Sequence, residues 1–224
     1  MKKFELTSEF VTFLGKKFFR IKALVAFGDV KEGELGGFVE KEENLDQSGD
    51  AWVFGNARVF GDAWVFGNAR VFGDARVSGD ARVFGDARVS GNARVSGNAR
   101  VFGDARVSGN ARVSGNARVS GDAQVSGNAR VSGDAQVSGN AWVSGDAHIQ
   151  CCRDCSAASC FGSENRTTTF FREKDGGIGV RCGCFYGTMS EFREKVKERH
   201  GDSRLAKEYL MLADLMEFRL SKDE

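Results

Sequence analysis

Six cysteines have the spacing that first suggests chemistry, and all lie between Cys151 and Cys184. Cys152 and Cys155 form a Cys-x-x-Cys pair, and Cys182 and Cys184 form a Cys-x-Cys pair. Four thiolates are a common ligand set for a structural zinc ion. The two pairs could hold a zinc ion if a hairpin between them folds back over residue 155. The alternative is a set of small buried or free thiols.

The two histidines, His148 and His200, are the candidates for a general base. A general base needs an orienting partner and a substrate pocket. His148 takes the place that arginine has in neighbouring repeats, and no inserted loop lies nearby. His200 precedes Gly201 at the expected end of a helix, where a cation complements the helix dipole. Both patterns favour structural roles, and we identify no catalytic residue.

Arginine and aromatic residues recur at fixed intervals and suggest binding. One set, eighteen residues apart, is Arg58, Arg76, Arg94, Arg112 and Arg130. A second set at the same interval is Phe66, Phe84 and Phe102, with Trp64 close to the first. If this interval aligns residues in columns, the first set is a cation ladder for an acidic partner and the second is an apolar strip of the kind found at interfaces. The alternatives are a solvated row of charges and rings that pack only on one another.

These columns require a regular repeat, which the sequence contains. From Gly49 to Gln150 the chain consists of seventeen six-residue units of the general form Gly-Asp/Asn-Ala-Arg-Val-Ser/Phe, without an insertion or a proline. A period of six fits neither the ~3.6-residue turn of a helix nor a hairpin meander. Three units make one triangular coil, and coils about 4.8 Å apart give a rod roughly 27 Å long. The predicted fold class is mainly β, a parallel β-solenoid.

The chemistry of each position agrees with this fold. Alanine and valine lie two residues apart, so both point into the rod and the residue between them points outward. Glycine followed by Asp or Asn forms the corner, because these residues tolerate the left-handed region. Nine corner aspartates accompany eleven arginines and offset most of their charge. Coils bury apolar residues only against neighbouring coils, so both ends need caps.

The chain therefore divides into an N-terminal cap over residues 1–48, the solenoid over 49–150 and a small α+β module over 151–224. In this module Thr167–Glu173 and Ile178–Cys182 flank an Asp-Gly-Gly turn and predict a β-hairpin.

Two helices are expected to complete the module. Thr188-Met189-Ser190-Glu191 is a capping box that predicts a helix ending at Gly201, and a second helix begins near Ser203. The second helix has an apolar face that we expect to pack on the hairpin or on the last coil: Leu205, Tyr209, Leu212, Leu215, Met216 and Leu220. The module is thus predicted to be a C-terminal cap.

Both ends of the chain also resemble known proteins. The N-terminal segments that carry the resemblance are Phe19–Leu24, Phe27–Val30, Gly33–Val39 and Glu43–Leu45. Together with the repeats they resemble the hexapeptide-repeat proteins of bacteria and their phages, often labelled transferases, and this implies a left-handed parallel β-helix. The segments Thr169–Gly177, Cys182–Phe185 and Gly187-Thr188 resemble a small α+β module of phage and prophage proteins. Neither resemblance implies a reaction.

Charge and targeting signals narrow the function classes. Thirty-two basic and thirty-one acidic residues leave no field that would draw the chain to nucleic acid or a membrane. The chain has no long apolar segment, and its cysteines do not form a framework across the whole fold, so the bacterial cytoplasm is the expected location. Phosphate spacing along nucleic acid does not match the ladder, which favours a protein partner.

We therefore expect a non-catalytic scaffold or macromolecule-binding protein encoded by a phage or prophage. Two alternatives stay open. One is a phage-encoded inhibitor that blocks a host enzyme or defence system by surface mimicry. The other is a hexapeptide-repeat acyltransferase, an enzyme class that is usually trimeric, with a histidine base and a pocket formed by loops that interrupt the solenoid.

Overall fold

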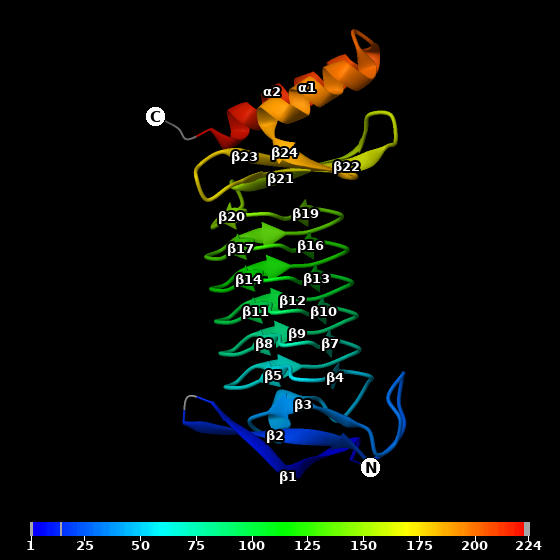
Figure 1. Ribbon diagram of the computed structural model, residues 1–224, viewed down its shortest axis with the longest axis vertical. Helices are drawn as coiled ribbons and strands as arrows, with labels where there is room; N and C mark the ends of the chain where they lie inside the picture. Colours follow the sequence, from blue (N-terminus) through cyan, green and yellow to red (C-terminus); the bar gives the residue numbers. More distant parts are fainter. Residues whose placement is uncertain (1, 14, 222–224) are drawn as a thin grey trace.

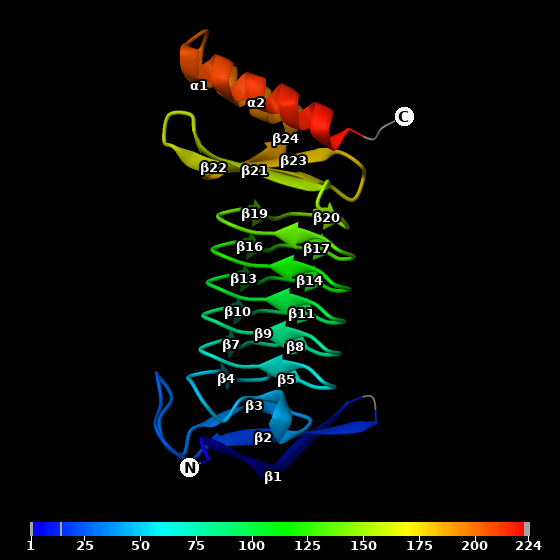
Figure 2. The same cartoon turned by 180° about the vertical axis from the view of Figure 1, so that it is seen from behind.

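The computed structural model describes residues 2–13 and 15–221, which form an N-terminal cap, a rod and a C-terminal module (Figure 1). The cap contains β1 (Phe4–Phe13), β2 (Lys16–Ala23), β3 (Leu35–Val39) and the short 3-10 helix η1 (Glu42–Asn44). β1 and β2 form an antiparallel hairpin, β2 pairs with β3, and β3 pairs in parallel with the first strand of one side of the rod. Figures 1 and 2 show the hairpin lying across the lower end of the rod.

The rod is a parallel β-solenoid with a sheet on each of three faces, which confirms the predicted fold class. The first face contains β5 (Arg58–Val59), β8 (Arg76–Val77), β11 (Arg94–Val95), β14 (Arg112–Val113), β17 (Arg130–Val131) and β20 (His148–Ile149). The second contains β4 (Trp52–Val53), β7 (Arg70–Val71), β10 (Arg88–Val89), β13 (Arg106–Val107), β16 (Gln124–Val125) and β19 (Trp142–Val143). The third contains β6 (Trp64–Val65), β9 (Arg82–Val83), β12 (Arg100–Val101), β15 (Arg118–Val119) and β18 (Gln136–Val137).

The six-residue unit explains the regularity of the rod. Every alanine and valine of the repeats is at most 2% exposed, so the core is a continuous stack of small side chains. Main-chain bonds link each coil to the next: the Arg94 N–H donates to the Ala111 carbonyl at 2.9 Å, in register with its neighbours. At the corners, asparagines form side-chain ladders, as where Asn98 Nδ2 donates to Asn116 Oδ1 at 3.2 Å. The repeat therefore specifies the core, the register and the corners together.

Aromatic rings close the lower end of this core. Trp52 is fully buried, with the ring of Phe4 at 6.1 Å and that of Phe27 at 5.3 Å, both edge-on. Beside them, Lys3 Nζ donates hydrogen bonds of 2.9–3.2 Å to three main-chain carbonyl groups between Ser48 and Ala51. Burial lowers the pKa of Lys3 to about 8, because removal from water disfavours the charged amine.

The C-terminal module is a four-stranded antiparallel sheet covered by two helices. Its strands are β21 (Cys155–Phe161), β22 (Arg166–Arg172), β23 (Ile178–Cys182) and β24 (Phe185–Thr188), and its helices are α1 (Met189–His200) and α2 (Arg204–Leu220). Figures 1 and 2 show the sheet across the upper end of the rod, with both helices on the far side of the sheet. Within the described ranges, no helix is long and apolar enough to cross a membrane.

The two faces of this sheet have different partners. Phe171 belongs to the apolar core of the rod, whereas the adjacent Phe170 packs against the helices, with its ring 5.9 Å from that of Phe192. Thr169 Oγ1 accepts a hydrogen bond of 2.9 Å from the main-chain N–H of Trp142 in the last coil. The sheet therefore closes the rod on one face and supports the helices on the other.

Most local predictions for this module are confirmed. β22 and β23 form the expected hairpin, and Thr188, Gly201 and Ser203 occupy the expected cap positions of α1 and α2. The prediction for the apolar face of α2 was partly wrong, because Leu205 is 36% and Leu215 57% exposed. These two leucines lie outside the helix face that reaches the sheet. Strands β21 and β24 were not predicted.

Candidate functional site: outward side chains of the rod

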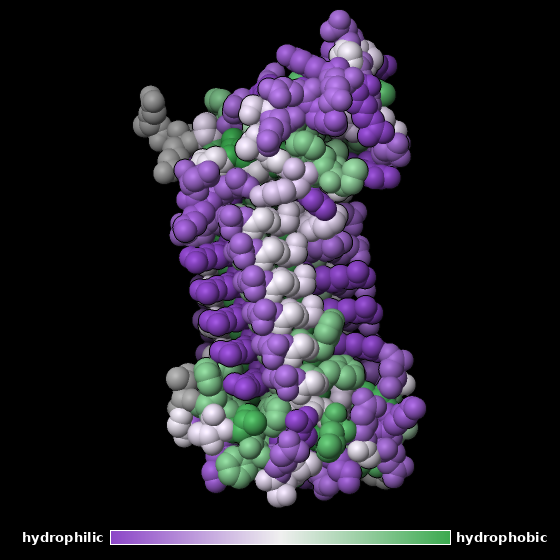
Figure 3. Space-filling model, in the orientation of Figure 1, coloured by the Kyte–Doolittle hydropathy of each residue, from purple (hydrophilic) through white to green (hydrophobic). Residues whose placement is uncertain are grey.

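The structure brings the predicted arginine ladder together in a single column on the first face. The aligned residues are Arg58, Arg76, Arg94, Arg112 and Arg130, and the column ends at His148. Strand pairing in register sets this alignment. Figure 3 shows rows of hydrophilic side chains along the rod and apolar side chains gathered towards its two ends.

The N-terminal hairpin covers the first two positions of this ladder. The guanidinium carbons of Arg58 and Arg76 lie 5.3 and 4.7 Å from the centre of the Phe13 ring, within the range of cation–π contacts. Arg94, Arg112 and Arg130 are exposed beyond the hairpin. Sequence reasoning missed this contact, although the β-branched and aromatic residues of Phe4–Phe13 are a signal for a strand. The free part of the first ladder is therefore three arginines long.

The second face is also partly occupied by the cap. Trp52, at its lower end, is buried under the cap rather than exposed. Arg70 forms an ion pair with Asp29 of the cap at 2.6 Å. The cap thus contacts the outward side chains of two faces.

The third face keeps its outward side chains free. Trp64 is 38% exposed, and Arg82, Arg100 and Arg118 above it are exposed. In the part of the chain that the structure describes, no ion pair involves these three arginines. The third face therefore offers three arginines in register above a tryptophan.

An aromatic column consisting of Trp64, Phe66, Phe84 and Phe102 runs along the corner after the third face. The ring centres are 4.1, 4.7 and 5.0 Å apart in that order, and the phenylalanine rings are nearly parallel, at 6° and 3°. The predicted alignment is thus formed, and the rings pack on one another. The three phenylalanines are half-buried, so part of each side chain remains at the surface.

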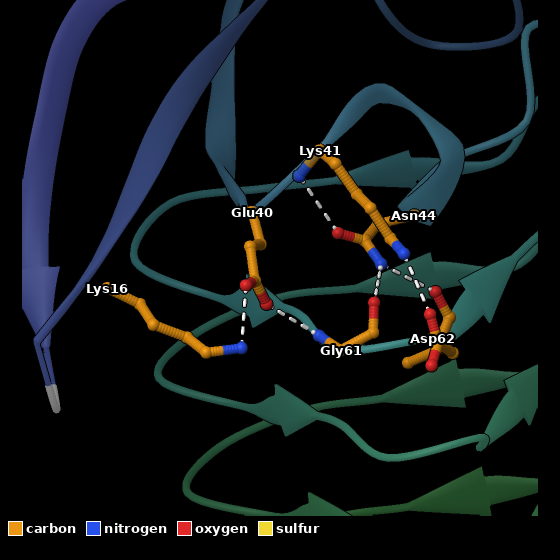
Figure 4. Close-up of polar contacts among 7 residues, drawn as sticks. Lys16, Glu40, Lys41, Asn44, Gly61 and Asp62 are labelled. Atoms are coloured by element: carbon orange, nitrogen blue, oxygen red, sulfur yellow. Dashed lines mark hydrogen bonds and ion pairs between the residues drawn. The ribbon is translucent and has the colours of Figure 1, made fainter.

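A cluster of hydrogen-bonded polar side chains, which sequence reasoning also missed, joins the cap to the first coil (Figure 4). The carboxylate of Glu40 accepts hydrogen bonds from Lys16 Nζ at 2.7 Å and from the Gly61 N–H at 2.8 Å. These bonds, the one from Lys16 first, lower the pKa of Glu40. Asn44 Nδ2 donates to the carbonyls of Gly61 at 3.0 Å and Ala63 at 2.8 Å, as a further coil would. Glu40 and Asn44 thus provide hydrogen-bond partners for main-chain groups at the lower edge of the rod.

The four cysteines predicted as zinc ligands are not brought together. Cys155 packs against the core of the rod, and Cys182 packs against the helices on the opposite face of the sheet. Cys152 and Cys184 line separate cavities. Across residues 2–13 and 15–221, no group of three or more His, Cys, Asp or Glu side chains could hold a metal ion. Burial raises the pKa of Cys155 to about 12, which keeps its thiol protonated.

The two histidines lie far apart in the fold. His148 is an outward residue of β20, with its Nε2 3.3 Å from Gln150 Nε2. His200 ends α1, and its ring stacks on that of Tyr209 at 5.6 Å. In the part of the chain that the structure describes, no loop interrupts the solenoid beside either histidine.

Comparison with known protein families supports the same architecture. The repeats match a family model described as the YdcK beta solenoid repeat, over residues 63–79, 75–91, 87–101, 93–109, 99–115, 111–123, 123–135 and 135–150. These matches begin at the third face of the first coil and leave the N-terminal cap and the C-terminal module outside. A search of curated proteins finds no significant match. The chain is a repeat β-solenoid protein.

Proposed function

We propose that this β-solenoid is a non-catalytic scaffold that binds an acidic protein partner along its third face. The binding surface consists of Arg82, Arg100 and Arg118 together with the aromatic column. The observation that carries the proposal is the combination of exposed arginines, in register and outside any ion pair of the described chain, with stacked rings at the adjacent corner. Arginine and aromatic residues are the types enriched at protein interfaces.

The fold does not require arginine at these positions. Gln136 follows Arg118 in the fifth position of the same column, and Gln124 takes the fifth position on the second face, each with the same strand geometry. Adjacent cations ~4.8 Å apart in water repel by about 0.9 kcal/mol. Arginine at positions where glutamine also fits therefore lowers the stability of the rod when no partner is bound. A partner with carboxylates relieves that repulsion.

The corner aspartates favour a protein over nucleic acid as the partner. Corner aspartates alternate with the arginine columns and leave the repeats only slightly basic, with nine aspartates against eleven arginines. A continuous phosphate backbone would contact these carboxylates as well as the cations. A folded acidic protein can instead place separate carboxylates opposite separate guanidinium groups.

The acyltransferase alternative is not favoured. Its general base would need an oriented histidine beside a pocket on the solenoid. His148 contacts Gln150 at the upper end of the rod, and His200 stacks on Tyr209 in the C-terminal module. The inhibitor alternative predicts the same kind of binding surface, so the identity of the partner separates it from a scaffold.

The test compares two triple variants of the full chain that have the same change in charge. The first is Arg82→Gln, Arg100→Gln and Arg118→Gln on the third face; the second is Arg94→Gln, Arg112→Gln and Arg130→Gln on the first face. Glutamine is the residue that the repeat itself uses. Because the resemblance is to proteins of bacteria and their phages, proteins are captured from a bacterial lysate at low and high salt.

We expect the third-face variant to lose a partner that wild type and the first-face variant both retain, and high salt to weaken the binding. The captured partner, purified, should then bind wild type directly. Equal retention by both variants, or no partner of wild type, would refute the proposal. Loss in the first-face variant alone would instead assign binding to the first ladder.

A further inference from the structure

A cavity in the C-terminal module lies apart from the outward surface of the rod. It has a volume of about 340 Å³ and lies where the β21–β22 turn, the β23–β24 turn and α1 meet. The residues that argue for its function are Arg166, Cys184, Phe192, Lys195, Arg199 and Tyr209. Cavities that bind small molecules begin at about 300 Å³. The cavity is therefore large enough for a small ligand.

The lining of the cavity includes a cluster of apolar and aromatic side chains. Phe192 lines the cavity and packs between two other lining rings, with the Phe185 ring 5.7 Å away and the Tyr209 ring 5.9 Å away. Val196, one turn further along α1, also lines the cavity and is buried. The rings come from β24, α1 and α2, so packing of the three elements holds them in place. This cluster suits an aromatic or aliphatic group.

The rim of the cavity is basic. Arg166 of β22 and Lys195 and Arg199 of α1 provide three cations, against the single carboxylate of Glu164. Glu164 lies 3.7 Å from Arg166, at the long end of an ion pair, and both side chains are more than half exposed. Lys195 pairs with Glu198 outside the cavity, and in the described chain Arg199 takes part in no ion pair. Positive charge thus exceeds negative charge around the opening.

The helix dipole accounts for only part of this charge. Basic residues in the last turn of a helix complement its partial negative charge, and Arg199 and His200 are in that turn of α1. Arg166 comes from a strand, and Lys195 precedes the last turn. The helix dipole therefore does not account for Arg166 or Lys195.

We propose that this cavity binds a small organic anion with an aromatic or apolar body. The body lies on Phe192, Phe185 and Tyr209, and the anionic group faces Arg166, Lys195 and Arg199. The site is independent of the partner surface of the rod, so either can fail without the other.

The first experiment uses anilinonaphthalene sulfonate, an aromatic anion, and phenylnaphthylamine, its neutral counterpart, as fluorescent probes of the full chain. The binding variant is Lys195→Gln with Arg199→Gln, and the control is Lys197→Gln with Lys207→Gln, which removes the same charge from residues that do not line the cavity. Glutamine preserves helix propensity. We expect the binding variant to weaken sulfonate binding about ten-fold and the control to leave it unchanged.

A second readout locates the probe. Cys184 is exposed and lines this cavity, whereas Cys151 is exposed and lines a different one. Alkylation followed by mass spectrometry should show that the sulfonate slows modification of Cys184 and leaves that of Cys151 unchanged. Equal affinity of the two probes, equal affinity of the two variants, or unprotected Cys184 would overturn the proposal. The last result would instead assign the probe to another surface, such as the exposed α2 residues Met211 and Phe218.

Discussion

Replacing a corner glycine by alanine tests how closely the coils approach one another. Gly97 and Gly139 occupy the same position of the repeat and have nearly the same backbone, with φ of +66° and +62°. A Cβ on Gly97 would lie 3.0 Å from the nitrogen and 3.1 Å from the oxygen of Gly115 in the next coil. A Cβ on Gly139 would meet nothing within 4 Å. Gly139→Ala is therefore a matched control for Gly97→Ala.

Comparing Gly97→Ala with Gly139→Ala separates the cost of backbone strain from the cost of contact with the next coil. An alanine with positive φ costs about 1–2 kcal/mol at either position. At Gly97 the Cβ must also push back a main chain that is hydrogen-bonded, and overpacking of this kind costs roughly 1–3 kcal/mol more. The smaller entropy of the unfolded chain with alanine offsets about 0.4–1 kcal/mol in both variants, so it cancels in the comparison. We expect Gly97→Ala to lose about 1–3 kcal/mol more unfolding free energy than Gly139→Ala.

Urea denaturation followed by circular dichroism measures this difference. The midpoint should fall further for Gly97→Ala, while the dependence on urea should keep the wild-type slope in both variants. If Gly139→Ala destabilises the protein as much as Gly97→Ala does, contact of the added Cβ with the next coil is not the cause of the loss. An unchanged midpoint in both variants would refute the cost of positive φ as well.

Three further predictions concern side chains. Phe84→Ser removes two ring stacks, whereas Phe72→Ser changes the same repeat position where the ring lies outside the aromatic column. Phe84→Ser should therefore lower the unfolding free energy by roughly 1–3 kcal/mol more than Phe72→Ser. Equal losses of unfolding free energy in urea denaturation would contradict a stabilising role for the stacking. Between about pH 8 and 10.5, Lys3 is protonated in the unfolded chain but not in the folded one, so the unfolding free energy of wild type relative to Lys3→Met should rise with pH. A difference in thermal unfolding midpoint between the two proteins that stays constant with pH would contradict the lowered pKa of Lys3. Iodoacetamide at pH 8 should modify exposed Cys151 well before Cys155, whose pKa burial raises to about 12, and equal rates in peptide mass spectra would show that Cys155 is accessible as a thiolate.

The sequence by itself determined what depends on the repeat and on short local signals. The six-residue unit places alanine and valine inside and glycine at each corner, which leaves little choice of register between coils. Residues eighteen apart, one full coil, are therefore aligned, as Arg94 is with Arg112 and Phe84 with Phe102. The capping box at Thr188 and the glycine at position 201 set the ends of α1 in the same way, because their hydrogen bonds lie within one helical turn.

Only the tertiary structure decided how segments without a common period meet. Docking of the hairpin brings Phe13 under the first two arginines of the first ladder, and no local rule links residues that far apart in sequence. Likewise, spacing along the chain does not reveal that Cys155 and Cys182 lie on opposite faces of one sheet. The apolar residues of α2 likewise predicted a buried face but not its width, which depends on packing against α1, β21 and β22.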